Sequence, residues 1–167
     1  MNNLVCNAMQ LDRLDISILK ELQGNASVSI QELGARVGLS ATPCWRRVKR
    51  LQSDGFIRKQ VALLDAQLLE LKVNVFVHVK LKAHSDEMLK QFEESVATIP
   101  EVVECYSVSG DTDFLLRIVV ADVATYETLL YKKLIRLREV GTLNSMFALR
   151  QVKYTTELPI TSASTSR

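Results

Sequence analysis

The sequence predicts an α+β protein: an N-terminal three-helix helix-turn-helix domain, followed by a ferredoxin-like (split βαβ) domain with the element order βαββαβ. Two patterns favour this fold. Over residues 11–57, apolar residues recur every three or four positions, as in amphipathic helices. Beyond residue 71, apolar and polar residues alternate as in half-buried strands, with two helical stretches between them. A chain of 167 residues, 47% of them hydrophobic, can bury a small core in each domain.

The first two helices have clear boundary signals. Asp12 can cap the first helix, along which apolar residues recur every four positions. Ser29 and Glu32 have the spacing of a capping box at the start of the second helix. Gly38 suits the left-handed residue that ends this helix, so a short turn leads to the third. Gly34, inside the second helix, indicates either close packing or a tolerated weak spot.

The third helix has an apolar side and a cationic side. Cys44, Val48 and Leu51 cluster on the apolar side of a helical wheel. The opposite side carries Thr42, Arg46, Lys49, Arg50 and Ser53. Arg47 lies on the flank, where its guanidinium can reach a phosphate. Residues 46–60 hold six Lys or Arg against one acid, whereas the flanking regions have a slight acidic excess. This local charge can displace counterions from double-stranded DNA, although a solvated face with ion pairs is the simpler alternative for such a run.

The second half of the chain alternates between strand and helix patterns. Its predicted elements are strands at 56–64, 73–81, 102–109, 114–120 and 143–153, a helix with the stripe Leu89, Phe92, Val96 and Ile99, and a helix with Tyr126, Leu130, Leu134 and Leu137. The βαββαβ order places both helices on one face of a four-stranded antiparallel sheet. We expect a second copy of the chain to bury the other face, which carries groups such as Phe76 and Tyr106.

These patterns divide the chain into five parts. The expected parts are a flexible N-terminus at 1–10, the helix-turn-helix domain at 11–57, a linker strand and connection at 58–71, the ferredoxin-like domain at 72–157, and a disordered tail at 158–167. Residues 1–10 lack signal-peptide features, and no stretch approaches the roughly 18 apolar residues of a membrane span. We therefore expect a cytoplasmic protein without a membrane partner.

The residues that often carry chemistry are scattered. Cys6, Cys44 and Cys105 are too widely spaced for a zinc knuckle and are expected to be free thiols, with Cys44 packed as a small hydrophobe. His78 and His84 are expected at a surface or interface. No nucleophile set and no phosphate-binding glycine loop are present in the sequence. We therefore expect no catalytic residue, no metal ligand and no cofactor.

The turn that joins the predicted strands 102–109 and 114–120 has two interpretations. In the first, Gly110 to Asp113 only connect the strands of a hairpin, with glycine supplying a positive φ. In the second, the backbone N–H groups of Gly110, Asp111 and Thr112 bind a carboxylate, while Asp111 or Asp113 binds an ammonium group. These two requirements describe a free amino acid. Because the surrounding sheet is rich in Val and Leu, an aliphatic or thioether side chain is the expected kind.

From about residue 11 to 157, the chain resembles the Lrp/AsnC (leucine-responsive regulator, feast/famine) family of transcription regulators. The resemblance rests on the run GLSATPCWRRVKRL and on GDTDFLLRIVV. It implies DNA contacts from Ser40, Thr42, Arg46, Arg47, Lys49 and Arg50. It also implies an effector site formed by Gly110, Asp111, Thr112, Asp113 and Ser145. Members form homodimers through their sheet domains and then an octamer or larger ring, and an amino acid bound between dimers alters assembly or DNA affinity. Trp45 and Gly34 depart from the residues common in the family. Neither departure threatens the fold, but Trp45 leaves the DNA sequence preference open.

Two alternatives remain open at this stage. Some siroheme decarboxylases resemble the same architecture, so the fold alone cannot decide function. The chain could also be an oligomeric amino-acid-binding module without DNA binding. A purified protein that is colourless and shifts DNA would exclude both alternatives.

Overall fold

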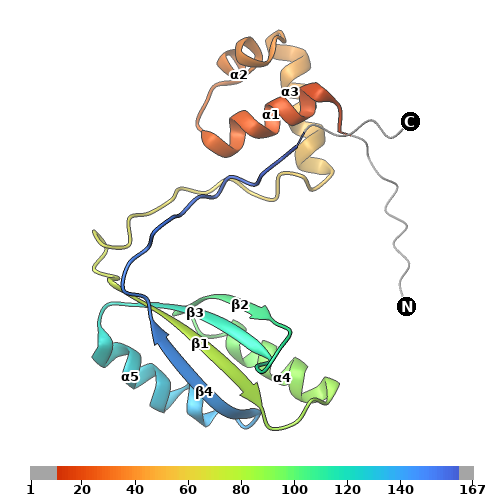
Figure 1. Cartoon of the computed structure of the whole chain (residues 1–167). Helices are drawn as coiled ribbons and strands as arrows, with labels where there is room; N and C mark the ends of the chain where they lie inside the picture. The colour runs from red at the N-terminus through yellow and green to blue at the C-terminus, as the bar shows by residue number, and fades with distance from the viewer. Residues whose placement is uncertain (1–10, 162–167) are drawn as a thin grey trace. The chain divides into compact units, whose positions relative to one another are not determined.

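The structure, a computed structural model, describes residues 11–161 of the chain. It divides into two compact units, which Figure 1 shows with their helices and strands labelled. The sheet unit spans Leu64–Val152, and the helical unit contains residues 11–63 together with residues 153–161. The sheet domain was expected to extend to residue 157. The structure instead places residues 153–157 in the helical unit.

The helical unit has three short helices: α1 (Arg13–Gly24), α2 (Ile30–Val37) and α3 (Ala41–Ser53). The expected capping box at Ser29 is present, and Asp12, which was expected only as a cap, forms a second one with the residue three positions later. Gly38 is left-handed with φ of 73°, as expected. Ser40 occupies the N-cap of α3 without a side-chain cap hydrogen bond. The fully or almost fully buried apolar residues at the centre are Ile18, Leu33, Cys44, Val48 and Leu51.

Gly34 allows the turn after α2 to pack closely on the helix. A Cβ atom at this position would lie 2.6 Å from the backbone oxygen of Leu39. The backbone N–H of Leu39 in turn donates to the carbonyl of Gly34 at 2.8 Å. Of the two interpretations of this glycine, the structure therefore supports close packing.

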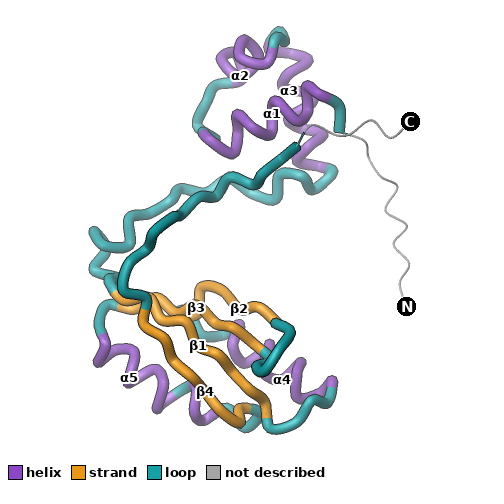
Figure 2. The backbone as a smooth tube through the Cα atoms, in the orientation of Figure 1, coloured by secondary structure: helices purple, strands orange, loops and turns teal. Residues whose placement is uncertain are grey.

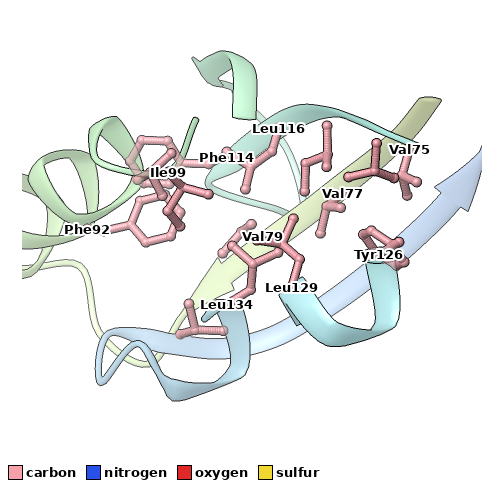
Figure 3. Close-up of a cluster of buried hydrophobic side chains, with 14 of the residues drawn as sticks. Val75, Val77, Val79, Phe92, Ile99, Phe114, Leu116, Tyr126, Leu129 and Leu134 are labelled. Carbon is pink, nitrogen blue, oxygen red and sulfur yellow. The ribbon is translucent and has the colours of Figure 1, made fainter. Parts of the chain in front are cut away.

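The sheet unit has the predicted βαββαβ order. Its elements are β1 (Val73–Leu81), α4 (Asp86–Ala97), β2 (Val102–Ser107), β3 (Phe114–Val120), α5 (Val123–Lys132), the 3₁₀ turn η1 (Leu134–Arg136) and β4 (Val140–Phe147). The strands pair antiparallel in the order β2-β3-β1-β4. Both helices lie on one face of the sheet (Figure 1). The alternate residues of β1 and β3 are buried beneath them and form the core in Figure 3.

Two expected strands are changed by the lack of a partner. Residues 56–64 form no strand, and Figure 2 draws this segment as a loop. Ile57 packs against the helical core, but most of their other apolar side chains stay exposed, with 61% for Val61 and 75% for Leu64. The last strand ends at Phe147 instead of 153, since Phe147 pairs with Val75 and β1 begins only two residues earlier. A strand persists only while a neighbour accepts and donates its backbone hydrogen bonds.

Other boundaries shift less. Residues 66–70, within the expected connection, form a turn. The second helix of the sheet unit continues past Lys132 only as the 3₁₀ turn η1. Cys44 is buried and Cys105 is exposed, both as free thiols. The expectations for residues 1–10, including Cys6, and for 162–167 lie outside the described residues.

The start of the expected disordered tail is ordered against α1. The side-chain amide of Gln23 donates to the Leu158 carbonyl and accepts from the Leu158 N–H, each at 3.0 Å. Leu158 and Ile160 line an apolar groove together with Leu19 and Leu22 of α1. Residues 158–161 are therefore part of the helical unit. No helix within residues 11–161 combines the length and apolar character needed to cross a bilayer.

Candidate nucleic-acid interface and ligand turn

The outer face of α3 is the most cationic helical surface of the protein. Cys44, Val48 and Leu51 turn into the core, so the positions between them face outward, as the wheel predicted. Ser40, Thr42, Arg46 and Lys49 are all exposed. Within residues 11–161, neither Arg46 nor Lys49 takes part in an ion pair. A helix with such a face has the shape and charge to enter a major groove.

Arg47 and Arg50, also expected on the DNA surface, are bound to carboxylates of α1. Arg47 Nη1 lies 2.6 Å from Asp12 Oδ2 and 2.8 Å from Asp15 Oδ1. Arg50 Nη2 pairs with the other oxygen of Asp15, and Arg50 Nε lies 3.9 Å from Asp54. The Asp15 side chain has no exposed surface at all. The N-terminus of α1 and the middle of α3 thus share one network of charges.

The network shifts the pKa values of Asp12 and Arg47. Burial raises the pKa of Asp12, but hydrogen bonds from the Asp15 backbone and from Arg47 outweigh it and lower the pKa below its ordinary value. Hydrogen bonds to Asp12 and Asp15 raise the pKa of Arg47. Local sequence signals place Asp15 only in the first turn of α1. Its pairing with residues 32 and 35 positions later has no local signal in the sequence.

The turn between β2 and β3 presents unused backbone donors. Gly110 has φ of 121°, which favours glycine, and nothing would lie within 4 Å of a Cβ there. Among the described residues, no protein acceptor takes the N–H groups of Gly110, Asp111 or Thr112. The Asp111 side chain is exposed. The turn therefore combines open donors for a carboxylate with an open carboxylate for a cation.

Asp113 has a different role from Asp111. Its Oδ2 accepts the backbone N–H of Leu81 at 2.7 Å, and its Oδ1 lies 2.8 Å from His84 Nε2. The hydrogen bond from Leu81 is the main reason that the pKa of Asp113 falls below its ordinary value. Thr112 Oγ1 lies 3.3 Å from His78 Nδ1. Sequence reasoning placed both histidines at a surface and missed these contacts, which fix the turn to β1 and to the segment after it.

Ser145 does not join the turn in this protomer. It pairs with Val77, which is buried under the helices, so its side chain lies on the helix-covered face. There its hydroxyl is hydrogen-bonded to the hydroxyl of Tyr126 in α5. The structure brings together four of the five residues expected for the effector site and separates the fifth.

The uncovered sheet face mixes polar and apolar groups. Arg117 donates to Asn74 at 3.2 Å and to Glu104 at 2.6 Å. Tyr106 and Met146 on the flanking strands are exposed by 53% and 46%. Within the described part of the chain, no group of three or more His, Cys, Asp or Glu residues could hold a metal ion.

Comparison with known proteins identifies both units. A profile described as winged helix-turn-helix DNA-binding matches residues 11–58, and one described as Lrp/AsnC ligand binding domain matches residues 74–158. The chain is 40% identical over 151 residues to the glutamate uptake regulatory protein of Zymomonas mobilis, an alignment that covers 90% of this chain and 92% of that protein.

Solved structures agree with the sequence relatives. An AsnC family transcriptional regulator from Agrobacterium tumefaciens matches with a TM-score of 0.85 and 48% identity, covering 89% of this chain and 97% of that one. A transcriptional regulator from Neisseria meningitidis, solved as an L-Met complex, matches with a TM-score of 0.86 and 35% identity, covering 90% and 97%. With both domains matched in the same order and nearly over their full lengths, the chain belongs to the Lrp/AsnC family of DNA-binding transcription regulators.

Proposed function

We propose that this protein regulates transcription by binding a specific DNA sequence through α3, and that a free amino acid at the Gly110–Asp113 turn changes its assembly or DNA affinity. The proposal of an amino-acid effector rests on one observation. The same turn presents three backbone N–H groups without a protein acceptor and the exposed carboxylate of Asp111. An α-amino acid offers the matching carboxylate and ammonium groups.

The proposed DNA contacts are Ser40, Thr42, Arg46 and Lys49, which are exposed and take part in no ion pair within residues 11–161, whereas the exposed Arg50 is paired with Asp15. Arg46 is the candidate for reading a base, because its position on α3 is opposite the core residues and an arginine can bind guanine through two hydrogen bonds. Such a contact is worth about 1 to 3 kcal/mol of discrimination between bases. Since DNA is the partner, we place the protein in the cytoplasm.

Within the proposed effector site, the four turn residues have different roles. Gly110, Asp111 and Thr112 present N–H groups to the carboxylate, and Asp111 pairs with the ammonium group. Asp113 holds the turn in place, because both of its oxygens are already bonded. Most apolar side chains of β1 and β3 are buried in the core, but Leu115 lies on the uncovered face and favours an aliphatic or thioether effector. The Neisseria relative with bound L-Met supports a ligand of this kind.

The proposed assembly is a homodimer formed through the uncovered sheet face, with dimers joined into an octamer or larger ring. Exposed Tyr106 and Met146 on this face support an apolar contact with a second copy. Two copies related by a two-fold axis would meet half-sites about 10 bp, or a multiple of it, apart on DNA. Light scattering at micromolar concentration is expected to show a dimer or a larger assembly, and a monomer would contradict the proposal.

Calorimetry with each of the twenty amino acids tests the effector site. We expect an aliphatic or thioether amino acid to bind the wild type, while Asp111→Ala and Gly110→Trp lose binding and keep basal DNA affinity. The mutated residues belong to the sheet unit, whereas α3 belongs to the helical unit. Glu127→Ala, an exposed substitution in α5, serves as the control that keeps both activities. Undiminished binding by both turn variants would mean that the turn is only a hairpin connection.

A gel shift with genomic fragments separates the regulator from the two alternatives. The relatives reported above are regulators, and we expect a colourless protein that retards a subset of fragments. A siroheme decarboxylase-like enzyme would bind a porphyrin and leave the fragments unshifted. A module that binds amino acids alone would also leave them unshifted but would still respond in calorimetry.

A further inference from the structure

We propose that Asp15 decides which basic residues of α3 meet DNA, by retaining Arg47 and Arg50 inside the helical unit as positioning residues. Arg46 and Lys49 are then the cations that reach the duplex. This inference rests on the proposed DNA binding by α3 and revises the set of contacts that the sequence implied.

The first argument is the burial of the Asp15 carboxylate. Its side chain is fully buried, and both oxygens are occupied. Oδ1 accepts from Arg47, while Oδ2 accepts from Arg50 and from the backbone N–H of Asp12 at 3.1 Å. A buried carboxylate is tolerated only when it is paired and hydrogen-bonded. If the two guanidinium groups turned toward phosphates, this buried charge would lose both of its cationic partners and keep only the hydrogen bond from the Asp12 N–H.

The second argument is geometric. Arg47 and Arg50 are three residues apart on α3 and hold the same carboxylate, so one residue of α1 fixes α3 at two adjacent positions of one helical turn. Arg47 is further held by Asp12, the N-cap of α1. These contacts set the rotation of α3 about its own axis and therefore which residues face outward.

The third argument is the contrast with the other two cations of the helix. The Arg47 side chain is 27% exposed and bound to two carboxylates, and the Arg50 side chain, although 49% exposed, is also bound to Asp15. Arg46 and Lys49 are exposed and make no ion pair within residues 11–161. A cation without a protein partner is free to replace the counterions of a phosphate. The network thus divides four neighbouring basic residues into two pairs. Arg47 and Arg50 position the helix, and Arg46 and Lys49 contact DNA.

The salt dependence of DNA binding measures this division. The logarithm of the association constant falls with the logarithm of salt concentration, and each phosphate contact contributes about 0.9 to the slope. The experiment follows fluorescence anisotropy of the full chain on a random-sequence duplex across a sodium chloride series. Lys49→Gln should make the slope shallower by about 0.9. Arg47→Gln and Arg50→Gln should leave the slope unchanged and lower the midpoint of thermal unfolding. Lys133→Gln, which removes a paired lysine of the sheet unit, controls for net charge.

Asp15→Asn should change the salt dependence in the opposite direction to Lys49→Gln. Releasing two guanidinium groups should make the slope steeper by about 1 to 2 and reduce the preference for the cognate site over random DNA. A residue with only a structural role would not steepen the slope. If this variant does not fold, the two arginine variants decide: a slope loss equal to that of Lys49→Gln in either one would overturn the proposal. Failure of the wild type to bind any duplex would overturn the proposed DNA binding itself, and this assignment with it.

Discussion

The two units of this protein are stabilised in different ways, yet each prepares its candidate site in the same manner. The helical unit has a small apolar core and a charged network centred on Asp15. The sheet unit has a much larger core, with apolar side chains from all of its helices and from β1, β3 and β4. In each unit, both oxygens of one carboxylate are bonded to other groups of the protein: Asp15 in the helical unit and Asp113 in the sheet unit.

This comparison shows how a polar group can contribute to a site without touching its ligand. Asp15 and Asp113 fix the elements that carry the binding groups, while Arg46, Lys49 and Asp111 remain open. A polar group that is already bonded loses little by staying in place, whereas an open one gains by meeting a ligand. Polar groups that are already bonded within the protein therefore fix the shape of a site, and polar groups without a partner are the ones that contact the ligand.

The largest expected effect concerns the sheet core. Phe92 is fully buried, and its ring centroid lies 4.6 Å from that of Phe114. Phe92→Ala should lower the free energy of unfolding by about 4 kcal/mol, since it removes a large buried ring and leaves a cavity. Urea unfolding followed by circular dichroism measures the loss. Trp45, the one tryptophan of the chain, lies in α3, so its fluorescence follows the helical unit separately.

The comparison predicts that the Trp45 signal of Phe92→Ala changes less than the circular dichroism signal. If both signals shift together by the same amount, the two units unfold cooperatively and their different stabilisation has no separate thermodynamic consequence. Glu94→Ala, an exposed substitution on the same helix α4, is the matched control and should change stability by less than about 0.5 kcal/mol.

A smaller effect is expected where the helical unit packs most closely. Gly34→Ala should destabilise the protein by about 1 to 2 kcal/mol, because overpacking against the Leu39 backbone outweighs the roughly 1 kcal/mol that alanine gains in a helix. Ala35→Gly, at the next and exposed position, isolates the propensity term and should cost about 1 kcal/mol. Thermal unfolding followed at Trp45 compares the two. A more stable Gly34→Ala variant would show that the turn can move away from α2.

The smallest expected effect is the pH dependence of the turn. The pKa of Asp113 in the folded protein is lower than its ordinary value of 3.8, mainly because the Leu81 N–H donates to the carboxylate. Its contribution to stability is therefore complete above about pH 3.8, and it disappears as the pH falls through the lower folded value. Asp113→Asn should lack this component, so the stability difference between wild type and variant should shrink as the pH falls from 5 toward about 2.

Urea unfolding of both proteins across that range provides the measurement. Asp111→Asn is the control, since the Asp111 carboxylate is exposed and no turn donor holds it. A difference between wild type and Asp113→Asn that stays constant with pH would mean that the Leu81 bond does not favour the ionised carboxylate.

The sequence by itself determined the elements whose signals lie within a few residues. The capping boxes at Asp12 and Ser29, the left-handed Gly38 and the alternation of β1 all act between positions no more than four apart. The division of α3 into core and cationic sides follows from helical periodicity alone. The βαββαβ order then limits the chain to few arrangements, so the sheet and its uncovered face could also be predicted.

Only the tertiary structure decided which groups pair across long separations. It placed Asp15 against Arg47 and Arg50, and Asp113 against His84. It also removed the expected strand at 56–64, because β propensity creates no strand without a hydrogen-bonded neighbour. The physical reason is common to these cases. A local pattern fixes the conformation of a segment, whereas the partner of a polar side chain depends on how separately formed segments pack, which no single stretch of sequence contains.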